Sequence, residues 1–219
     1  MKKLYILFGL ITTGLLGFDS YFYVARHQPL KKKYQEAVRQ KEDVQKELNQ
    51  KVAELSKTVE TKQGEIQNVQ STKDSLISEM QEEIQKNQIQ ITQMADKLKL
   101  SIVDKILFPS GEADISPEGL KVLLRVGNIL KNAQGKAVRV EGHTDNVRIG
   151  GNLKTRFPTN WELSAARATN VVRFLEDKVG MDPKRLEAAG LAENRPVAAN
   201  DTREGRAQNR RIEIYLLPL

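Results

Sequence analysis

The chain has 219 residues, of which 39% are hydrophobic and 29% charged, proportions that are ordinary for a folded protein and that exclude a collagen-like or disordered chain. Its formal net charge of +7 is spread along the sequence, and aromatic residues that could stack on bases make up only 5%, so we expect no nucleic-acid partner. The sequence has no cysteine, which excludes disulfides, thiolate catalysis and the lipid-modified cysteine of a bacterial lipoprotein.

Residues 1–26 include an apolar run from Leu4 to Ala25 whose one charged residue is Asp19. The run suits a signal peptide if it ends before Asp19, and it is long enough to span a bilayer if it continues to Ala25. No small-residue cleavage site follows it, and the aromatic residues at 21–23 are typical of a membrane interface. We therefore predict an uncleaved membrane anchor, with the inner membrane preferred and the outer membrane as the alternative. Asp19 lies near the outer end of the run, where its carboxylate reaches the interface, so we interpret it as an interfacial residue.

Residues 27–98 are rich in Lys, Glu and Gln and contain no proline after Pro29. Their apolar positions recur in steps of three and four residues, which predicts one long helix with a coiled-coil seam. Consecutive four-residue steps at Val44, Leu48 and Val52 loosen this seam locally. At 1.5 Å per residue the helix would be a spacer of roughly 100 Å, and two copies could join along it as a homodimer. The alternative is a single exposed helix, held by ion pairs between successive turns.

Residues 99–219 form the third predicted segment, in which short apolar runs alternate with amphipathic ones. The patterns predict strands at 98–108 and 138–143, a short strand or loop around 190, a last strand at 211–217, and helices at 117–133, 160–176 and 202–209. This order predicts an α/β fold, a sandwich of a mixed sheet with helices on one face.

The stretch at 138–146 places a carboxylate at the end of a strand. Its valines alternate with charged residues, and Gly142 lets the backbone turn just before Thr144 and Asp145. Thr159 and Glu162 then form a capping box that begins the next helix, on which Arg167 lies two turns in.

Asn160 and Arg167 are seven residues apart and therefore share one stripe of this helix. A helix that follows a strand packs back beside it. We therefore expect Asp145 and Arg167 to face one cleft.

Three ordered motifs resemble the OmpA-like C-terminal domain, a family that binds peptidoglycan. They are GHTDN at 142–146, N-x-x-L-S-x-x-R-A at 160–168 and RPVAANDTREGRAQNRRIEI at 195–214, and the likeness covers roughly residues 100–219. The loop between Asp145 and Asn160 is longer than in porin-type members of that family, and its end, FPTNWELS, is similar to flagellar stator B-type proteins (MotB).

The resemblance implies a ligand and a place in the cell. In the family, the residues that match Asp145 and Arg167 hold the ammonium and the carboxylate of diaminopimelate in the peptide stem, and the same motifs place Thr144, Asn160 and Leu163 at the site. The alternative is that Asp145 and Arg167 only pair with each other as a structural salt bridge. The implied function is to tether a membrane-anchored protein to peptidoglycan, with the C-terminal domain in the periplasm. A stator-like ion-channel subunit, anchored in the same way, is the other candidate.

No residue pattern predicts catalysis or a cofactor. The sequence has no nucleophile elbow, glycine-rich phosphate loop or pair of acids with glycosidase spacing, so we expect a protein that is not an enzyme. Glu141, His143 and Asp145 alternate along one strand, but neighbouring side chains of a single strand, without a histidine from another element, make a weak metal site. We therefore predict no metal.

Overall fold

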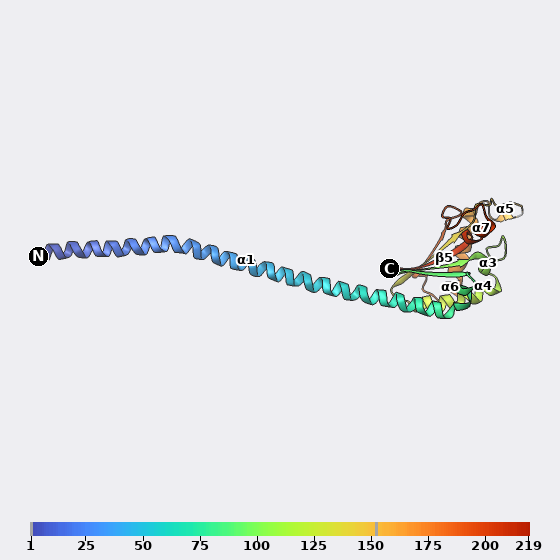
Figure 1. The fold of residues 1–219 in the computed structure, drawn as a ribbon, viewed down its shortest axis with the longest axis horizontal. Coiled ribbons are helices and arrows are strands. Elements are labelled where there is room, and N and C mark those ends of the chain that lie inside the picture. The colour runs from blue at the N-terminus through green and yellow to red at the C-terminus, as the bar shows by residue number, and fades with distance from the viewer. Residues whose placement is uncertain (1, 152) are drawn as a thin grey trace. The chain divides into compact units, whose positions relative to one another are not determined.

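Figure 1 shows the fold in a computed structural model, which describes residues 2–151 and 153–219, with side chains from Gly17 onward. The chain divides into two compact units, residues 1–60 and residues 61–219. Helix α1 (Lys2–Glu79) forms the described part of the first unit and continues into the second.

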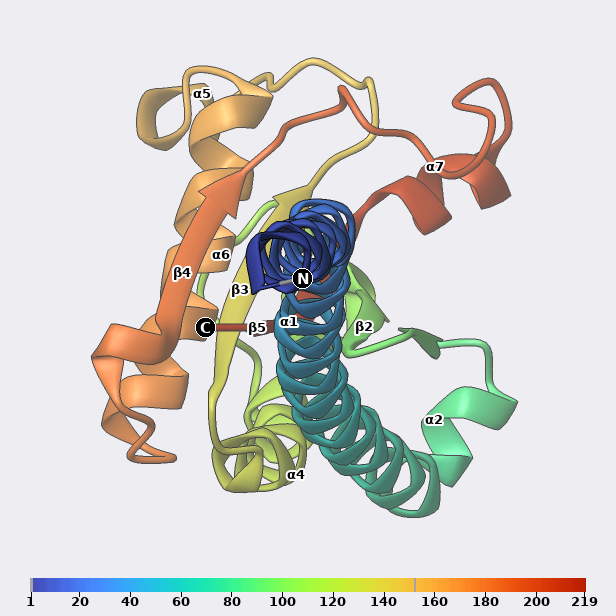
Figure 2. The ribbon, with the colours of Figure 1, turned by 90° about the vertical axis from the view of Figure 1, so that its left-hand side faces the viewer.

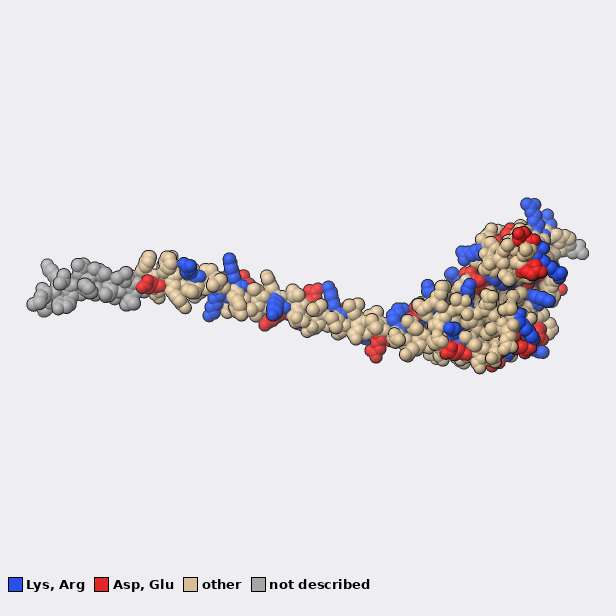
Figure 3. All heavy atoms as spheres, viewed as in Figure 1, with Lys and Arg blue, Asp and Glu red and all other residues tan. Residues whose placement is uncertain are grey.

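In the first unit, α1 exposes every side chain that is described. Val44, Leu48 and Val52 are 65%, 52% and 57% exposed, so the predicted apolar seam lies open in the single chain. Figure 3 shows basic and acidic side chains along this helix, and Lys51 Nζ lies 3.2 Å from Glu47 Oε1 one turn away. Such pairs are those expected of an exposed helix.

The predicted anchor at 1–26 falls mostly on side chains outside the described ones. Over the part of the chain that the structure does describe, no helix combines the length and the apolar character needed to cross a bilayer.

The second unit contains a five-stranded sheet with the strand order β1-β2-β5-β3-β4. β3 and β4 are parallel, and the other neighbouring strands are antiparallel. The strands are β1 (Ile89–Met94), β2 (Lys97–Val103), β3 (Lys136–His143), β4 (Leu186–Gly190) and β5 (Arg211–Pro218). The remaining helices are α2 (Gln81–Gln85), α3 (Asp104–Leu107), α4 (Pro117–Asn132), α5 (Leu153–Arg156), α6 (Asn160–Asp177), the 3₁₀ turn η1 (Pro183–Arg185) and α7 (Arg203–Asn209).

One face of the sheet is apolar and is covered by helices. Leu100 of β2, Val140 of β3 and Ile214 of β5 are at most 2% exposed. They belong to one apolar cluster with Val126 of α4 and Val171 of α6. Figure 2 shows α6 alongside β3 and β4, which it contacts extensively. The predicted mixed α/β fold is confirmed for this unit.

The long helix ends earlier than the sequence predicted. α1 stops at Glu79, and Leu76 and Met80 are fully buried in the apolar cluster of the second unit. Asn87 has φ 54°, the left-handed region in which a helix cannot continue. Residues 89–94 then form β1, which pairs with β2, instead of prolonging the helix to residue 98.

The strand predicted at 98–108 is also shorter. β2 ends at Val103, and residues 104–107 form the short helix α3. Asp104 N donates a hydrogen bond to Arg210 O at 3.0 Å, and Leu107 O accepts one from Ser116 N at 2.8 Å, so the backbone leaves the sheet here. This turn places the Asp104 side chain at the end of the sheet. Ser116 caps α4, because its hydroxyl accepts a hydrogen bond from Gly119 N at 3.0 Å.

Candidate functional site

A cleft of about 650 Å³ opens where β3 ends and β5 begins. It is lined by α3, the loop after β3, the first half of α6, and the corner between α7 and β5. The five residues predicted to bind a ligand all line this cleft: Thr144, Asp145, Asn160, Leu163 and Arg167. The structure therefore gathers them in one place, and their role in ligand binding stays a prediction.

Gly142 allows β3 and α6 to approach closely. A Cβ at this position would lie 2.1 Å from the carbonyl oxygen of Ser164, so a larger residue would push the helix away from the strand. The Ser164 hydroxyl accepts a hydrogen bond from Ala192 N at 3.1 Å, and Thr144 N donates to Ala192 O at 2.9 Å. These contacts fix the end of β3 against the helix face that lines the cleft.

Three of the predicted residues differ in whether their side chains can still form a hydrogen bond with a ligand. Asn160 Nδ2 donates to the carbonyl oxygens of Asp145 and Val147 at 3.3 and 3.1 Å, so this amide holds the loop in place. Leu163 is 5% exposed and packs in a small apolar cluster beside the cleft. Thr144 is 4% exposed, and its hydroxyl has no hydrogen-bond partner among the described residues. A buried hydroxyl without a partner costs about 1–3 kcal/mol, so this group is a candidate to bond a ligand.

Arg167 is held on three sides. Its Nη1 donates to Asp104 Oδ2 at 3.0 Å, and its Nε donates to Glu112 O at 2.9 Å. The guanidinium carbon lies 5.0 Å from the centre of the Phe108 ring, a favourable cation–π distance. No described residue accepts a hydrogen bond from Nη2, so one edge of the guanidinium remains for a ligand.

Asp145 pairs with a different partner. Its Oδ2 accepts a hydrogen bond from Arg210 Nη1, and its Oδ1 accepts one from Val147 N at 3.0 Å. Arg210 Nε also lies 3.7 Å from Asp104 Oδ1. Asp145 and Arg167 therefore face the same cleft, each with its own counter-charge, and the salt bridge between the two that the sequence left open is not formed.

Sequence reasoning missed Asp104 and Arg210, the two partners of the predicted pair. Arg210 lies inside the third motif, but the resemblance assigns no role to the charged residues of that motif. Asp104 is an acidic residue within the apolar stretch IVDKILF, and that position was a signal of a buried functional carboxylate.

Burial disfavours the ionised forms of both Asp104 and Arg167. Burial raises the pKa of the Asp104 carboxyl above its ordinary value, although the positive charges of Arg167 and Arg210 act against this shift. Burial likewise lowers the pKa of the Arg167 guanidinium, against the attraction of Asp104. The cost of removing both charges from water offsets much of the attraction in a buried ion pair, so the pair adds little to the stability of the fold. We infer that it serves to hold Arg167 in one orientation.

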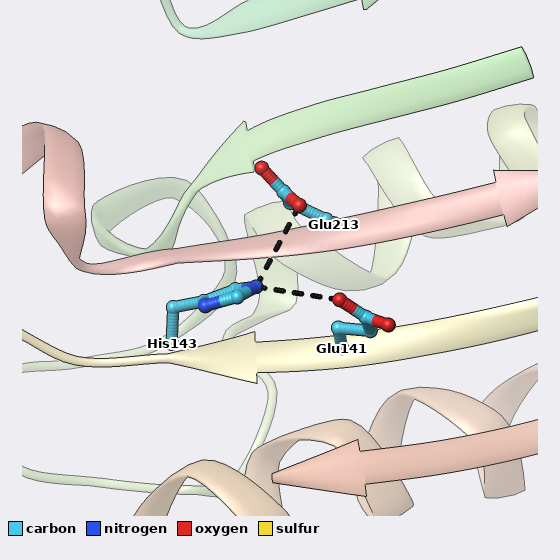
Figure 4. Close-up of side chains that lie close together, drawn as sticks. All are labelled: Glu141, His143 and Glu213. Atoms are coloured by element: carbon cyan, nitrogen blue, oxygen red, sulfur yellow. Dashed lines mark ion pairs between the residues drawn. The ribbon is translucent and has the colours of Figure 1, made fainter. Parts of the chain in front are cut away.

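A second group of charged residues lies on the sheet face opposite the helices. Figure 4 shows His143 between Glu213 and Glu141, with Nε2 at 3.6 and 3.8 Å from their carboxylates. Glu213 also accepts hydrogen bonds from Arg211 Nε at 2.9 Å and Tyr215 Oη at 2.6 Å. Burial acts against ionisation of Glu213, but these contacts outweigh burial and hold its pKa well below the ordinary value.

This second group differs from the set considered from the sequence, because Asp145 faces the cleft and Glu213 takes its place. Carboxylate and imidazole are ligands that several divalent metals accept, and the ligand atoms of Glu141, His143 and Glu213 lie within 4.8 Å of one another. Arg211 and Lys99, the latter 3.5 Å from Glu213 Oε1, already offset the negative charge here.

Comparisons with known proteins agree with this architecture. The model of the OmpA family matches residues 107–210. Motility protein B of Bacillus subtilis is 35% identical over 156 residues, which are 71% of this chain and 58% of that protein. The chain thus spans little more than half the length of this relative.

Several solved structures resemble the chain, including the following two. A MotB-like protein from Desulfovibrio vulgaris superposes with a TM-score of 0.65 at 28% identity, covering 73% of this chain and 96% of the other. The cell wall anchor of the T6SS from Pseudomonas aeruginosa gives a TM-score of 0.60 at 35% identity, covering 66% and 97%. The motifs, the mixed sheet and these likenesses agree, and the chain belongs to the OmpA family through the domain that contains residues 107–210.

Proposed function

We propose that the chain binds peptidoglycan non-covalently through the diaminopimelate of the stem peptide, without acting as an enzyme. The observation that supports this most is that Asp145 and Arg167 face one cleft and do not neutralise each other. The side-chain end of diaminopimelate carries an ammonium and a carboxylate on one carbon. Asp145 can accept the ammonium, and the planar fork of Arg167 matches the carboxylate.

The neighbouring residues divide the remaining work. Asp104 orients the Arg167 guanidinium, and Arg210 orients the Asp145 carboxylate. Asn160 fixes the loop, and the Thr144 hydroxyl is available for a further hydrogen bond to the ligand. No cofactor is needed for such recognition.

Binding to walls of two chemistries tests the proposal. The full chain should sediment with purified diaminopimelate-type peptidoglycan and much less with lysine-type peptidoglycan, whose side chain has no carboxylate beside the ammonium. Asp145→Asn should weaken binding by about 2–3 kcal/mol, roughly 30- to 150-fold, because a charged hydrogen bond is lost. Asp177→Asn, on an exposed residue at the end of α6, is the matched control. Wild-type sedimentation of Asp145→Asn, with an unchanged melting temperature, would contradict the assignment.

We further propose that residues 1–26 anchor the chain in a membrane, the inner membrane by preference, and that the helix beyond them spaces the C-terminal domain from that membrane in the periplasm. The similar Pseudomonas protein is a cell wall anchor, which supports attachment of the C-terminal domain to the wall in this arrangement.

The exposed apolar side chains of α1 support pairing with a second copy of this chain. In a fragment of residues 27–60, helix content should rise with concentration, and sedimentation equilibrium should give a dimer mass. A monomer with concentration-independent helicity would leave a single spacer helix.

The likeness to Motility protein B favours a second candidate, a stator-like ion-channel subunit that is anchored in the same way. The two proposals differ on Asp19. A subunit that conducts ions would lose its motility function on Asp19→Asn, whereas an anchor with an interfacial Asp19 would be unaffected.

A further inference from the structure

The cleft carries more positive charge than a diaminopimelate zwitterion requires. Two acidic side chains line it, Asp104 and Asp145, against six basic ones: Lys105, Arg148, Arg167, Arg203, Arg206 and Arg210. A ligand group with one ammonium and one carboxylate has no net charge, so the basic excess points to further anionic groups on the ligand.

Half of the basic side chains are already engaged within the protein. Arg167 and Arg210 pair with the two aspartates. Arg206 Nη1 donates to the carbonyl oxygens of residues 200 and 201 at 2.7 and 3.1 Å, so this residue fixes the loop before α7.

The other three form the basic rim of the cleft: Lys105, Arg148 and Arg203. All three are exposed, and none makes an ion pair with any described residue. They come from α3, the loop after β3 and the start of α7, so three separate segments direct cations to one opening.

The size of the cleft agrees with a ligand larger than one amino acid. Its volume of about 650 Å³ lies within the range of roughly 300–1,000 Å³ that accommodates drug-sized molecules. A stem peptide seated with its diaminopimelate between Asp145 and Arg167 would extend toward the rim. Such a peptide bears a carboxylate on the D-glutamate before diaminopimelate and another at its free C-terminus.

We propose that Lys105, Arg148 and Arg203 recognise these flanking carboxylates, so that the cleft selects stem peptides that are neither amidated nor cross-linked at them. This inference rests on the proposed function, because it assumes that diaminopimelate occupies the cleft. Amidation or cross-linking of these carboxylates removes the negative charge that the basic rim attracts. A synthetic peptide can carry this change and still keep the free ammonium and carboxylate of the diaminopimelate side chain. The rim therefore distinguishes wall segments that share the same central residue.

Two synthetic stem tetrapeptides test the inference by titration calorimetry with the full chain. Both contain diaminopimelate with a free side-chain ammonium and carboxylate; one has free flanking carboxylates, and the other has amides at those two positions. The wild-type chain should bind the free peptide about 3- to 10-fold more tightly, since exposed charge pairs contribute weakly one by one. This preference should shrink as salt is added, because exposed charges are screened.

Matched variants assign the preference to the rim. Arg148→Gln combined with Arg203→Gln leaves only Lys105 of the rim and should reduce the preference strongly, with the amidated peptide still bound as by the wild type. Arg173→Gln combined with Lys184→Gln removes the same charge from exposed positions outside the cleft and should preserve it. Equal binding of the two peptides by the wild type, or equal loss of the preference in both double variants, would overturn the inference.

The remaining outcomes are also decisive. If neither peptide bound, the proposed function itself would fail. If a phosphate-bearing polymer bound more tightly than either peptide, and only the Arg148 and Arg203 variant lost that binding, the rim would serve a different ligand and the inference would be wrong.

Discussion

A chain cut to residues 99–219 is expected not to fold into a stable domain. The cut removes β1 and the buried residues Val69, Leu76 and Met80, each at most 1% exposed. Truncating one large core side chain costs about 2–5 kcal/mol. Losing three together, with a sheet strand, costs an amount comparable to the roughly 5–15 kcal/mol that stabilises a typical domain.

Urea denaturation followed by circular dichroism measures this effect. The control is a fragment of residues 61–219, which retains the whole second unit and should unfold in one cooperative transition. A cooperative transition of the shorter fragment at the same urea concentration would show that the end of α1 and β1 are dispensable.

Arg167→Lys should weaken binding to diaminopimelate-type peptidoglycan by about 2–3 kcal/mol, roughly 30- to 150-fold, with little change in melting temperature. A lysine keeps the positive charge near Asp104, so the buried carboxylate is not left alone. It cannot also donate to Glu112 O and present a planar fork to a ligand carboxylate, as the guanidinium does. Affinity can be measured by sedimentation with purified wall, and stability by thermal melting.

Arg173→Lys is the matched control for this change, because Arg173 lies on the same helix and is exposed. It should bind as the wild type does. If Arg167→Lys also kept wild-type affinity, the guanidinium would not be the carboxylate-binding group.

Much of the domain was predictable where local signals were strong. The capping box of Thr159 and Glu162 forms as predicted at the start of α6. The alternation in β3 and β5 correctly placed the apolar side chains on one buried face, but most of the polar residues that alternate with them are buried as well.

The segment from 80 to 98 was not predictable because its signals conflict. Ile84 and Ile91 are seven residues apart and continue the heptad pattern of the helix. The strand signal is weaker, because the alternation of buried and exposed side chains in β1 spans only six residues. Leu76 and Met80 are buried in the core against the sheet, and this packing favours a helix that ends there and a strand that follows. Such a contact between distant parts of the chain cannot be read from the local sequence.

The site shows the same limit. The motifs placed Asp145 and Arg167 at one cleft, as the structure does. Their partners could not be found from spacing, because Asp104 and Arg167 are 63 positions apart and Asp145 and Arg210 are 65 apart. Only the folded sheet brings the start of β5 and the turn after β2 to the same point.

The end of α1 is part of the core of the second unit, and this has a mechanical consequence. Val69, Leu76 and Met80 belong to the same helix that leads to the N-terminus, so tension on that helix acts on their apolar contacts. A ligand that binds only the folded cleft stabilises the native state, by about 2.7 kcal/mol at a concentration 100 times its Kd. If the domain binds peptidoglycan as proposed above, the bound domain will therefore need more force to unfold than the free one, and binding will stabilise the part of the molecule that carries the load.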